Sequence, residues 1–293
     1  MNLGTVITAM ATPFNADGTI NYKRAQELAQ YLLDNGSDAL VICGTTGESP
    51  TMTDDEKEDL FVAVKEVTKG RAPLIAGTSF YDTYDSELMT KRAVKVGVDA
   101  ILAVSPYYNK PPQEGLYKHF EAIAAAAGDL PVILYNIPGR TAVNILPETI
   151  CRLSKVDNIV AVKEAAGDIE QVGKILALVD DDFLLYSGDD SMTLPMLSLG
   201  AAGVISIASH FVGPDIQKMI ADFKAGDVKG AMAMHYKLLD IFHKLFIVTN
   251  PIPVKYCLNK MGIDVGVYRL PMVEATAEQK TVLDAMLQQY GLI

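Results

Sequence analysis

Cysteine is scarce in this chain. Among 293 residues there are only three, Cys43, Cys151 and Cys257. Their number is odd, they are far apart, and no CxxC or cysteine–histidine spacing occurs, so the sequence indicates neither a disulfide framework nor a zinc site. The histidines are scattered as well, at His119, His210, His235 and His243. We therefore expect no metal, and a reducing compartment.

Positive charge is also in deficit, with 25 lysines and arginines against 36 acidic residues and a net charge of −11. This excess of negative charge argues against nucleic acids and anionic membranes as partners, although a few local arginines can still bind a small anionic substrate. No apolar run is long enough to span a bilayer, and residues 1–5 lack the features of a signal peptide. We expect a cytoplasmic protein.

Hydrophobic residues, by contrast, make up 49% of the chain, and they recur as short apolar runs that alternate with amphipathic segments. The runs predict eight strands, at 5–10, 39–43, 74–78, 100–105, 132–136, 159–165, 183–188 and 203–208. Helices are predicted at 22–35, 54–69, 82–96, 113–126, 147–155, 169–179, 192–199 and 214–224, and then, without further strands, at 227–246, 252–260 and 276–290.

Eight strand–helix units of this size are typical of a parallel (βα)8 TIM barrel. We predict a catalytic barrel over residues 1–224, followed by an α-helical region over 225–293. A doubly wound open sheet is the alternative, but no Gly-x-Gly-x-x-Gly follows the first predicted strand.

Lys163 is the most informative residue, because it lies inside a predicted strand, on the same face as Ala161 and Ala165. The small alanines leave room for a long side chain. Burial lowers the pKa of an amine and makes it a nucleophile. The alternative is a lysine near the strand end whose ammonium reaches water.

Other polar residues follow the carboxyl ends of the predicted strands, where TIM barrels have their active sites. They are the Gly-Thr-Thr-Gly-Glu-Ser run at 44–49, Tyr107, Tyr108 and Asn109, the segment from Tyr135 to Arg140 and Thr141, and Asp189 with Asp190. Hydroxyls, phenols and a guanidinium suit a carboxylate substrate. The two aspartates make a phosphorylated substrate less suitable, unless they cap the next helix. An amine without a metal or cofactor motif indicates a Schiff-base lyase or aldolase acting on a small keto acid.

In these motifs the chain resembles the dihydrodipicolinate synthase family, within the class I pyruvate-dependent aldolases that include N-acetylneuraminate lyase. The resemblance extends from Thr8-Ala9-Met10-Ala11-Thr12-Pro13-Phe14 to Asn250-Pro251-Ile252-Pro253-Val254-Lys255, and it includes the 44–49 run, the 135–141 segment and Val162-Lys163-Glu164-Ala165. Arg140 favours the synthases over the sugar-acid lyases.

The resemblance implies a role for each site residue. Lys163 would form a Schiff base with pyruvate, without any other cofactor, and Tyr135 would donate and accept protons. Thr45 would relay protons between Tyr135 and Tyr108, with Tyr108 reaching in from a neighbouring subunit of a homotetramer built as a dimer of dimers. Thr46 and Ile205 would contact pyruvate, and Arg140 the carboxylate of L-aspartate 4-semialdehyde. Gly188 would also belong to the substrate-binding site. The product would be 4-hydroxy-tetrahydrodipicolinate, on the route to diaminopimelate and lysine.

Two alternatives stay open. The chain could be another pyruvate-dependent aldolase, cleaving N-acetylneuraminate or a 2-keto-3-deoxy sugar acid, or a barrel that binds keto acids without catalysis. The resemblance also raises feedback inhibition by lysine, which sensitive relatives bind with histidines. Asp54 and Lys57 occupy those positions here, and Ser79, Tyr81 and Asp85 also differ. Because a cation at Lys57 repels the ligand's ammonium group, we expect weak or absent inhibition.

Overall fold

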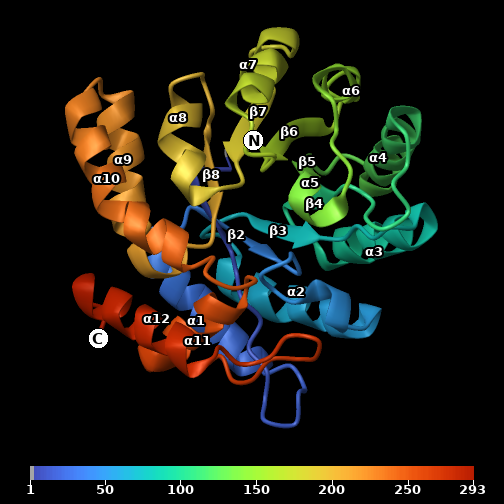
Figure 1. Ribbon diagram of the computed structural model, residues 1–293. Helices are drawn as coiled ribbons and strands as arrows, with labels where there is room; N and C mark the ends of the chain where they lie inside the picture. The colour runs from blue at the N-terminus through green and yellow to red at the C-terminus, as the bar shows by residue number, and fades with distance from the viewer. Residues whose placement is uncertain (1–2) are drawn as a thin grey trace.

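The computed structural model describes residues 3–293 and confirms the TIM barrel. Eight parallel strands pair in chain order, and β8 closes the sheet by pairing with β1 (Figure 1). Each strand lies within its predicted segment. They are β1 (Val6–Ala9), β2 (Ala39–Ile42), β3 (Leu74–Gly77), β4 (Ala100–Val104), β5 (Val132–Asn136), β6 (Ile159–Glu164), β7 (Leu184–Ser187) and β8 (Gly203–Ser206).

The barrel helices surround these strands in sequence order (Figure 1). They are α1 (Tyr22–Asp34), α2 (Asp54–Thr68), α3 (Thr83–Val96), α4 (Gln113–Ala127), α6 (Pro147–Leu153), α7 (Ile169–Leu178), α8 (Thr193–Leu197) and α9 (Ser209–Lys224), all close to their predicted bounds except α9. That helix begins five residues before the predicted start at 214, because a further turn precedes Pro214 across a kink at Val212. At the start of α2, Thr53 and Glu56 form a capping box, in which each side chain accepts a hydrogen bond from the backbone nitrogen of the other residue.

Three short helical segments are absent from our predictions. They are α5 (Pro138–Thr141) and the 3₁₀ turns η1 (Ser49–Thr51) and η2 (Asp190–Met192). Each is too short to show a hydrophobic period, so only the surrounding structure defines it. All three follow strand ends on the side of the barrel where the candidate residues gather.

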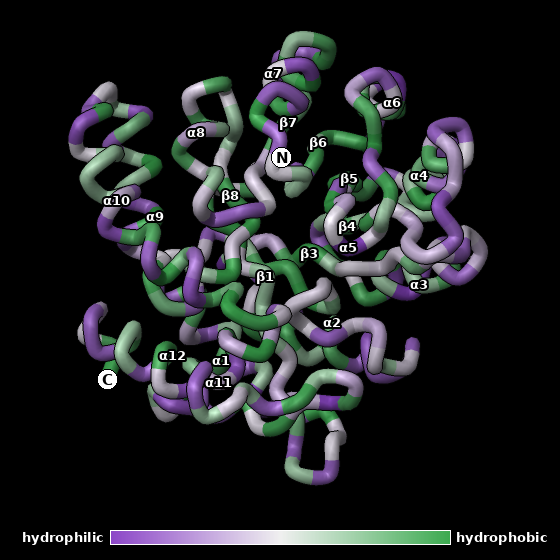
Figure 2. The backbone as a smooth tube through the Cα atoms, in the orientation of Figure 1, coloured by the Kyte–Doolittle hydropathy of each residue, from purple (hydrophilic) through white to green (hydrophobic). Residues whose placement is uncertain are grey.

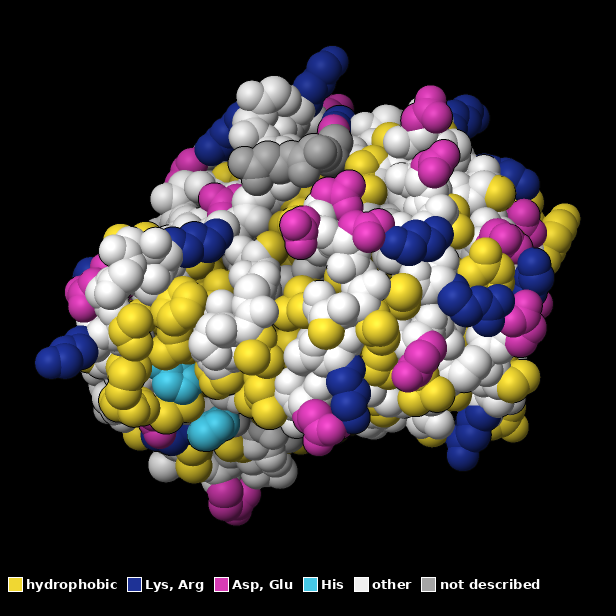
Figure 3. Space-filling model, turned by 90° about the horizontal axis from the view of Figure 1, so that it is seen from above, with side chains coloured by type: hydrophobic (Ala, Val, Ile, Leu, Met, Phe, Trp, Pro, Cys, Tyr) yellow, Lys and Arg dark blue, Asp and Glu magenta, His cyan; other side chains and the backbone are white. Residues whose placement is uncertain are grey.

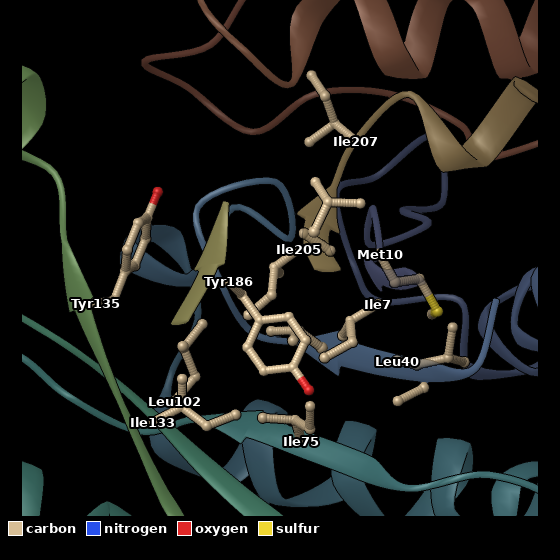
Figure 4. Close-up of a cluster of buried hydrophobic side chains, with 14 of the residues drawn as sticks. Ile7, Met10, Leu40, Ile75, Leu102, Ile133, Tyr135, Tyr186, Ile205 and Ile207 are labelled. Carbon is tan, nitrogen blue, oxygen red and sulfur yellow. The ribbon is translucent and has the colours of Figure 1, made fainter. Parts of the chain in front are cut away.

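The barrel interior is filled with side chains, and the strands form the apolar centre of the molecule (Figure 2). Ile7, Ile75 and Ile133 pack around Tyr186, whose hydroxyl donates a hydrogen bond to the carbonyl of Gly4, 3.0 Å away at the amino-terminal end (Figure 4). The hydroxyl of Tyr135 points the other way, toward Ile207 and the carboxyl ends of the strands. The core thus closes one end and leaves polar groups at the other.

The helices after the barrel are α10 (Val228–Lys244), α11 (Ile252–Lys260) and α12 (Ala277–Gln289). The first packs on α9 and on α12, and α11 packs on α12 (Figure 1). Arg24 of α1 forms an ion pair with Asp264, and Phe14 forms a backbone bridge with Gly266. These helices therefore pack directly on the barrel, and the boundary at residue 224 stays a prediction.

Acidic and basic side chains are interspersed over the face shown in Figure 3. Among residues 3–293, no helix is both long and apolar enough to cross a membrane.

Candidate active site

The carboxyl ends of the strands enclose a cavity of about 50 Å³ at the position predicted for the active site. It opens beside a larger cavity of about 220 Å³, with which it shares six residues, among them Thr45, Tyr135 and Arg140. Seven of the eight residues predicted for the site line the smaller cavity: Thr45, Thr46, Tyr135, Arg140, Lys163, Gly188 and Ile205. Residues from five strand ends, separated by up to 160 positions, thus meet in one place.

Lys163 projects into this cavity from β6. Its side chain is only 6% exposed, and burial lowers the pKa of its amine to about 8. The charge of Asp190 raises this pKa and that of Arg140 lowers it, but both act less strongly than burial. Lys163 is therefore the enclosed amine that the sequence indicated.

Glycine at position 188 makes room for this amine. A Cβ atom there would lie 2.7 Å from the Cβ of Ala165 and 3.1 Å from Cε of Lys163. Both distances are shorter than ordinary carbon–carbon contacts, so a side chain at this position would press against Ala165 and against the lysine.

Tyr135 lies directly beside Lys163, because β5 and β6 pair in a register that places Tyr135 opposite Lys163. Nζ of Lys163 is 4.3 Å from the centre of the Tyr135 ring. Burial raises the pKa of the phenol to about 12, while Arg140 and the Thr45 hydroxyl act to lower it. At neutral pH the site thus contains a protonated phenol next to an amine that is easily deprotonated.

The 44–49 loop brings Thr45 and Thr46 into the lining of the same cavity. Thr46 is buried, and its hydroxyl accepts a hydrogen bond of 2.9 Å from Nδ2 of Asn250. At the end of the loop, Glu48 adopts a left-handed conformation and forms a buried ion pair with Lys255, 2.8 Å away. The C-terminal region therefore holds the 44–49 loop in place through Asn250 and Lys255. The sequence alone did not reveal these contacts.

Arg140 stands on α5, in the segment that follows β5. A buried network holds this segment: Asn136 donates hydrogen bonds to Glu164 and to Asn144, and Asn144 donates to Gln171. Asn136 also accepts from the backbone nitrogen of Ile145. Asn136 and Glu164 directly follow Tyr135 and Lys163, so alternate strand positions serve the site and its support.

Tyr108 is the one predicted site residue that does not line either of these two cavities. It is 90% exposed and has a positive φ of 71°, whereas its neighbour Tyr107 lines the larger cavity. Within a single chain, Tyr108 takes no part in the site.

Asp190, Phe246 and Asn250 line the cavity but were absent from the predicted site. Capping of the next helix is the alternative that the sequence leaves open for Asp189 and Asp190. Asp189 is one, accepting hydrogen bonds from the backbone nitrogen and hydroxyl of Ser191, whereas Asp190 faces the cavity. Phe246 and Asn250 lie beyond the barrel. Asn250 is the first residue of the Asn250–Lys255 motif and Phe246 lies shortly before it, and this is the only signal in the sequence that could have indicated them.

Within residues 3–293, no group of three or more histidine, cysteine or acidic side chains is arranged to hold a metal ion. The charged side chains that line the smaller cavity are Arg140, Lys163 and Asp190. The site can therefore supply a nucleophilic amine, a proton donor, hydroxyls and a cation for carboxylates.

The chain is similar to known proteins over nearly its whole length. The chain is 55% identical to 4-hydroxy-tetrahydrodipicolinate synthase of Desulforamulus reducens, with 98% of this chain and 97% of that protein covered. It is 54% identical to the synthase of Listeria innocua, over 98% and 99% of the two chains.

Solved structures are similarly close. A dihydrodipicolinate synthase from Cyanidioschyzon merolae with lysine bound superposes with a TM-score of 0.98 at 47% identity, over 99% of both chains. The synthase DapA-2 of Bacillus anthracis gives 0.96 at 47% identity, over 98% of both. Residues 2–290 match the Dihydrodipicolinate synthetase family, and the chain belongs to that family.

Proposed function

We propose that this protein is a 4-hydroxy-tetrahydrodipicolinate synthase, a lyase that condenses pyruvate with L-aspartate 4-semialdehyde through a Schiff base on Lys163. The observation that carries the proposal is the buried amine of Lys163 opposite Tyr135 at the end of the barrel, in a chain of this family. The reaction belongs to the biosynthesis of diaminopimelate and lysine.

In the first step the neutral amine of Lys163 attacks the keto carbon of pyruvate. Loss of water from the adduct gives an iminium ion, and loss of a proton from the methyl carbon gives an enamine. A pKa of about 8 supplies a substantial fraction of neutral amine at physiological pH. The Tyr135 hydroxyl would protonate the departing hydroxyl group and take protons back later.

In the second step the enamine carbon attacks the aldehyde of the semialdehyde and forms the new carbon–carbon bond. The amino group of the second substrate then attacks the iminium carbon, closes the ring and releases Lys163. Arg140 borders both cavities, and its guanidinium suits the carboxylate of this substrate. Thr46, Gly188 and Ile205 line the part of the site where pyruvate would be held.

We also propose that the enzyme is a homotetramer built from two tight dimers, in which Tyr108 completes the site of the adjacent subunit. Support comes from its 90% exposure and its place next to Tyr107, which lines the larger cavity and packs edge-on against Tyr81 with ring centres 5.4 Å apart. Thr45 would then connect the partner's tyrosine with Tyr135. Three free thiols and no disulfide fit a cytoplasmic enzyme.

Reduction by borohydride in the presence of pyruvate tests the chemistry. Intact mass and peptide mapping should show one pyruvyl adduct on Lys163, which is lost in Lys163→Ala. The absence of an adduct, or an adduct on another lysine, would contradict the mechanism.

The substrate is tested separately, by following condensation with L-aspartate 4-semialdehyde and cleavage of N-acetylneuraminate side by side. We expect the first reaction and not the second. Cleavage of the sugar acid without condensation would instead assign the chain to another pyruvate-dependent aldolase.

A further inference from the structure

Three charged side chains line the small cavity: the two cations Lys163 and Arg140, and one carboxylate, Asp190. Pyruvate brings a carboxylate of its own. Once it is bound as an iminium ion, the site holds two positive and two negative charges, provided that Asp190 is ionised. This balance matters because an uncompensated charge in a buried site is costly.

Hydrogen bonds hold the Asp190 carboxylate in place. It is 3% exposed, and it accepts hydrogen bonds from the hydroxyl of Ser206 and from the backbone nitrogens of Ile207 and Ala208, 3.2 and 3.1 Å away. Backbone N–H groups can only donate, so two of the three partners favour the ionised carboxylate over a carboxylic acid. Burial acts in the opposite direction and raises the pKa of Asp190.

We propose that Asp190 is the counter-charge of the iminium ion on Lys163. This inference rests on the proposed Schiff-base function. When amine and ketone condense, one proton is taken up and one water leaves, so the Lys163 nitrogen passes from neutral to positive. A carboxylate that borders the same enclosed cavity stabilises that positive charge without moving, and Asp190 makes no covalent bond in the process.

The same carboxylate must also stabilise the ammonium form of free Lys163. Removing its charge should therefore have two opposite effects: the free amine loses its proton at lower pH and reacts faster, yet the iminium ion becomes less stable. The other groups that face Lys163 are the phenol of Tyr135, whose pKa is raised to about 12, and the guanidinium of Arg140, which lowers the pKa of Lys163. A defect of folding would not produce this pair of opposite changes.

Asp190→Asn is the suitable variant, because its carbonyl can accept from Ile207 and Ala208 while its amide donates to the Ser206 oxygen. Two measurements are needed: the pH midpoint for labelling of Lys163 by an amine-specific reagent without pyruvate, and the pyruvate concentration that gives half-maximal adduct on reduction. We expect the midpoint to fall by about one pH unit. At about pH 9, where the free amine is already neutral, we expect the pyruvate concentration to rise about tenfold.

Two controls separate charge from structure. Asp189→Asn removes the adjacent charge from a helix cap that asparagine also serves, and Ser206→Ala removes a hydrogen bond but keeps the Asp190 charge. Both should stay within about twofold of the unmodified protein, well below the expected tenfold change. If circular dichroism shows that Asp190→Asn does not fold, Asp190→Ser provides the uncharged side chain.

The outcomes are distinguishable. If the unmodified protein forms the Lys163 adduct but the uncharged variant matches it in both measurements, the counter-charge is wrong and the proposed function stands. The counter-charge is also wrong if Asp189→Asn changes the pH midpoint and the half-maximal pyruvate concentration as much as Asp190→Asn does. No adduct in the unmodified protein overturns both proposals.

Discussion

At the scale of single residues, one physical cause explains the two catalytic candidates. Burial disfavours charge, so it lowers the pKa of Lys163 to about 8 and raises that of Tyr135 to about 12. A nucleophile and a proton donor therefore coexist at neutral pH. Asp190, Arg140 and Thr45 also shift these two pKa values, but less strongly than burial does.

The pH dependence of imine formation should follow Lys163. Below its pKa the amine is protonated and cannot attack, so the rate of pyruvate trapping should fall about tenfold per pH unit below pH 7 and level off above about 8. Trapping measured between pH 5.5 and 9 checks this. A rate independent of pH over that range would contradict a titrating amine.

Substitution at position 188 tests the space kept for that amine. In Gly188→Ala the new methyl group would meet Cε of Lys163 at 3.1 Å and Ala165 at 2.7 Å, and should displace the nucleophile. We expect a loss of kcat of about a hundredfold, the size associated with a misplacement of about 1 Å.

Gly139→Ala is the matched control for this substitution, since a Cβ there has no neighbour within 4 Å. It should leave the steady-state rate nearly unchanged. Equal losses in the two variants would mean that the space at Gly188 is not specific to Lys163.

At the scale of elements, the threonine loop after β2 depends on a segment far away in the chain. Lys255 of α11 is fully buried beside the rings of Phe14 and Tyr268 and pairs with Glu48. Asn250 donates to Thr46 just before the same helix. The α-helical region after the barrel is thus part of the support of the active site.

Lys255→Met should leave the Glu48 carboxylate buried without its partner, which costs about 3–5 kcal/mol of unfolding free energy. Urea denaturation measures this loss, and adding Glu48→Gln should recover part of it. Lys155→Ala, which breaks the exposed ion pair with Asp180, should cost less than about 1 kcal/mol. If Lys255→Met and Lys155→Ala lose similar amounts of unfolding free energy, burial does not make the Lys255–Glu48 ion pair more important than an exposed one.

Helix α2 carries Lys57, the residue on which our prediction about inhibition by L-lysine depends. The ammonium of Lys57 on α2 is buried 4.0 Å from the centre of the Phe80 ring and 3.8 Å from Asp54. A related synthase from Cyanidioschyzon merolae has been solved with lysine bound. Here we expect L-lysine to inhibit weakly or not at all, because Lys57 repels its ammonium group. Half-inhibition of the condensation at submillimolar lysine would refute this.

At the scale of the whole molecule, the exposed Tyr108 predicts a site shared between subunits. Lys163→Ala and Tyr108→Phe should each be nearly inactive alone. When the two variants are mixed and allowed to exchange subunits, a site with both residues intact can form across the interface, so activity should exceed that of either variant. Sedimentation measures the assembly state in parallel. A mixture no more active than its parts would place Tyr108 outside the partner's site.

The sequence by itself determined the eight βα units, the barrel they imply and the candidate amine. These features depend on local periodicity and on residue type, which a single segment carries. Lys163 and Tyr135 lie near the carboxyl ends of their strands, and Arg140 follows one. All three were recognisable because these ends must meet once a barrel closes.

Which side chains of the site contact one another depends on the tertiary structure. The register that sets Tyr135 opposite Lys163, the turn of Asp190 into the cavity and the contacts of Asn250 and Lys255 with the threonine loop all join distant segments. Strand register and side-chain direction arise from closure of the barrel and packing of the last helices. No local pattern contains that information, because the same local sequence is compatible with more than one strand register and with different contacts between distant segments.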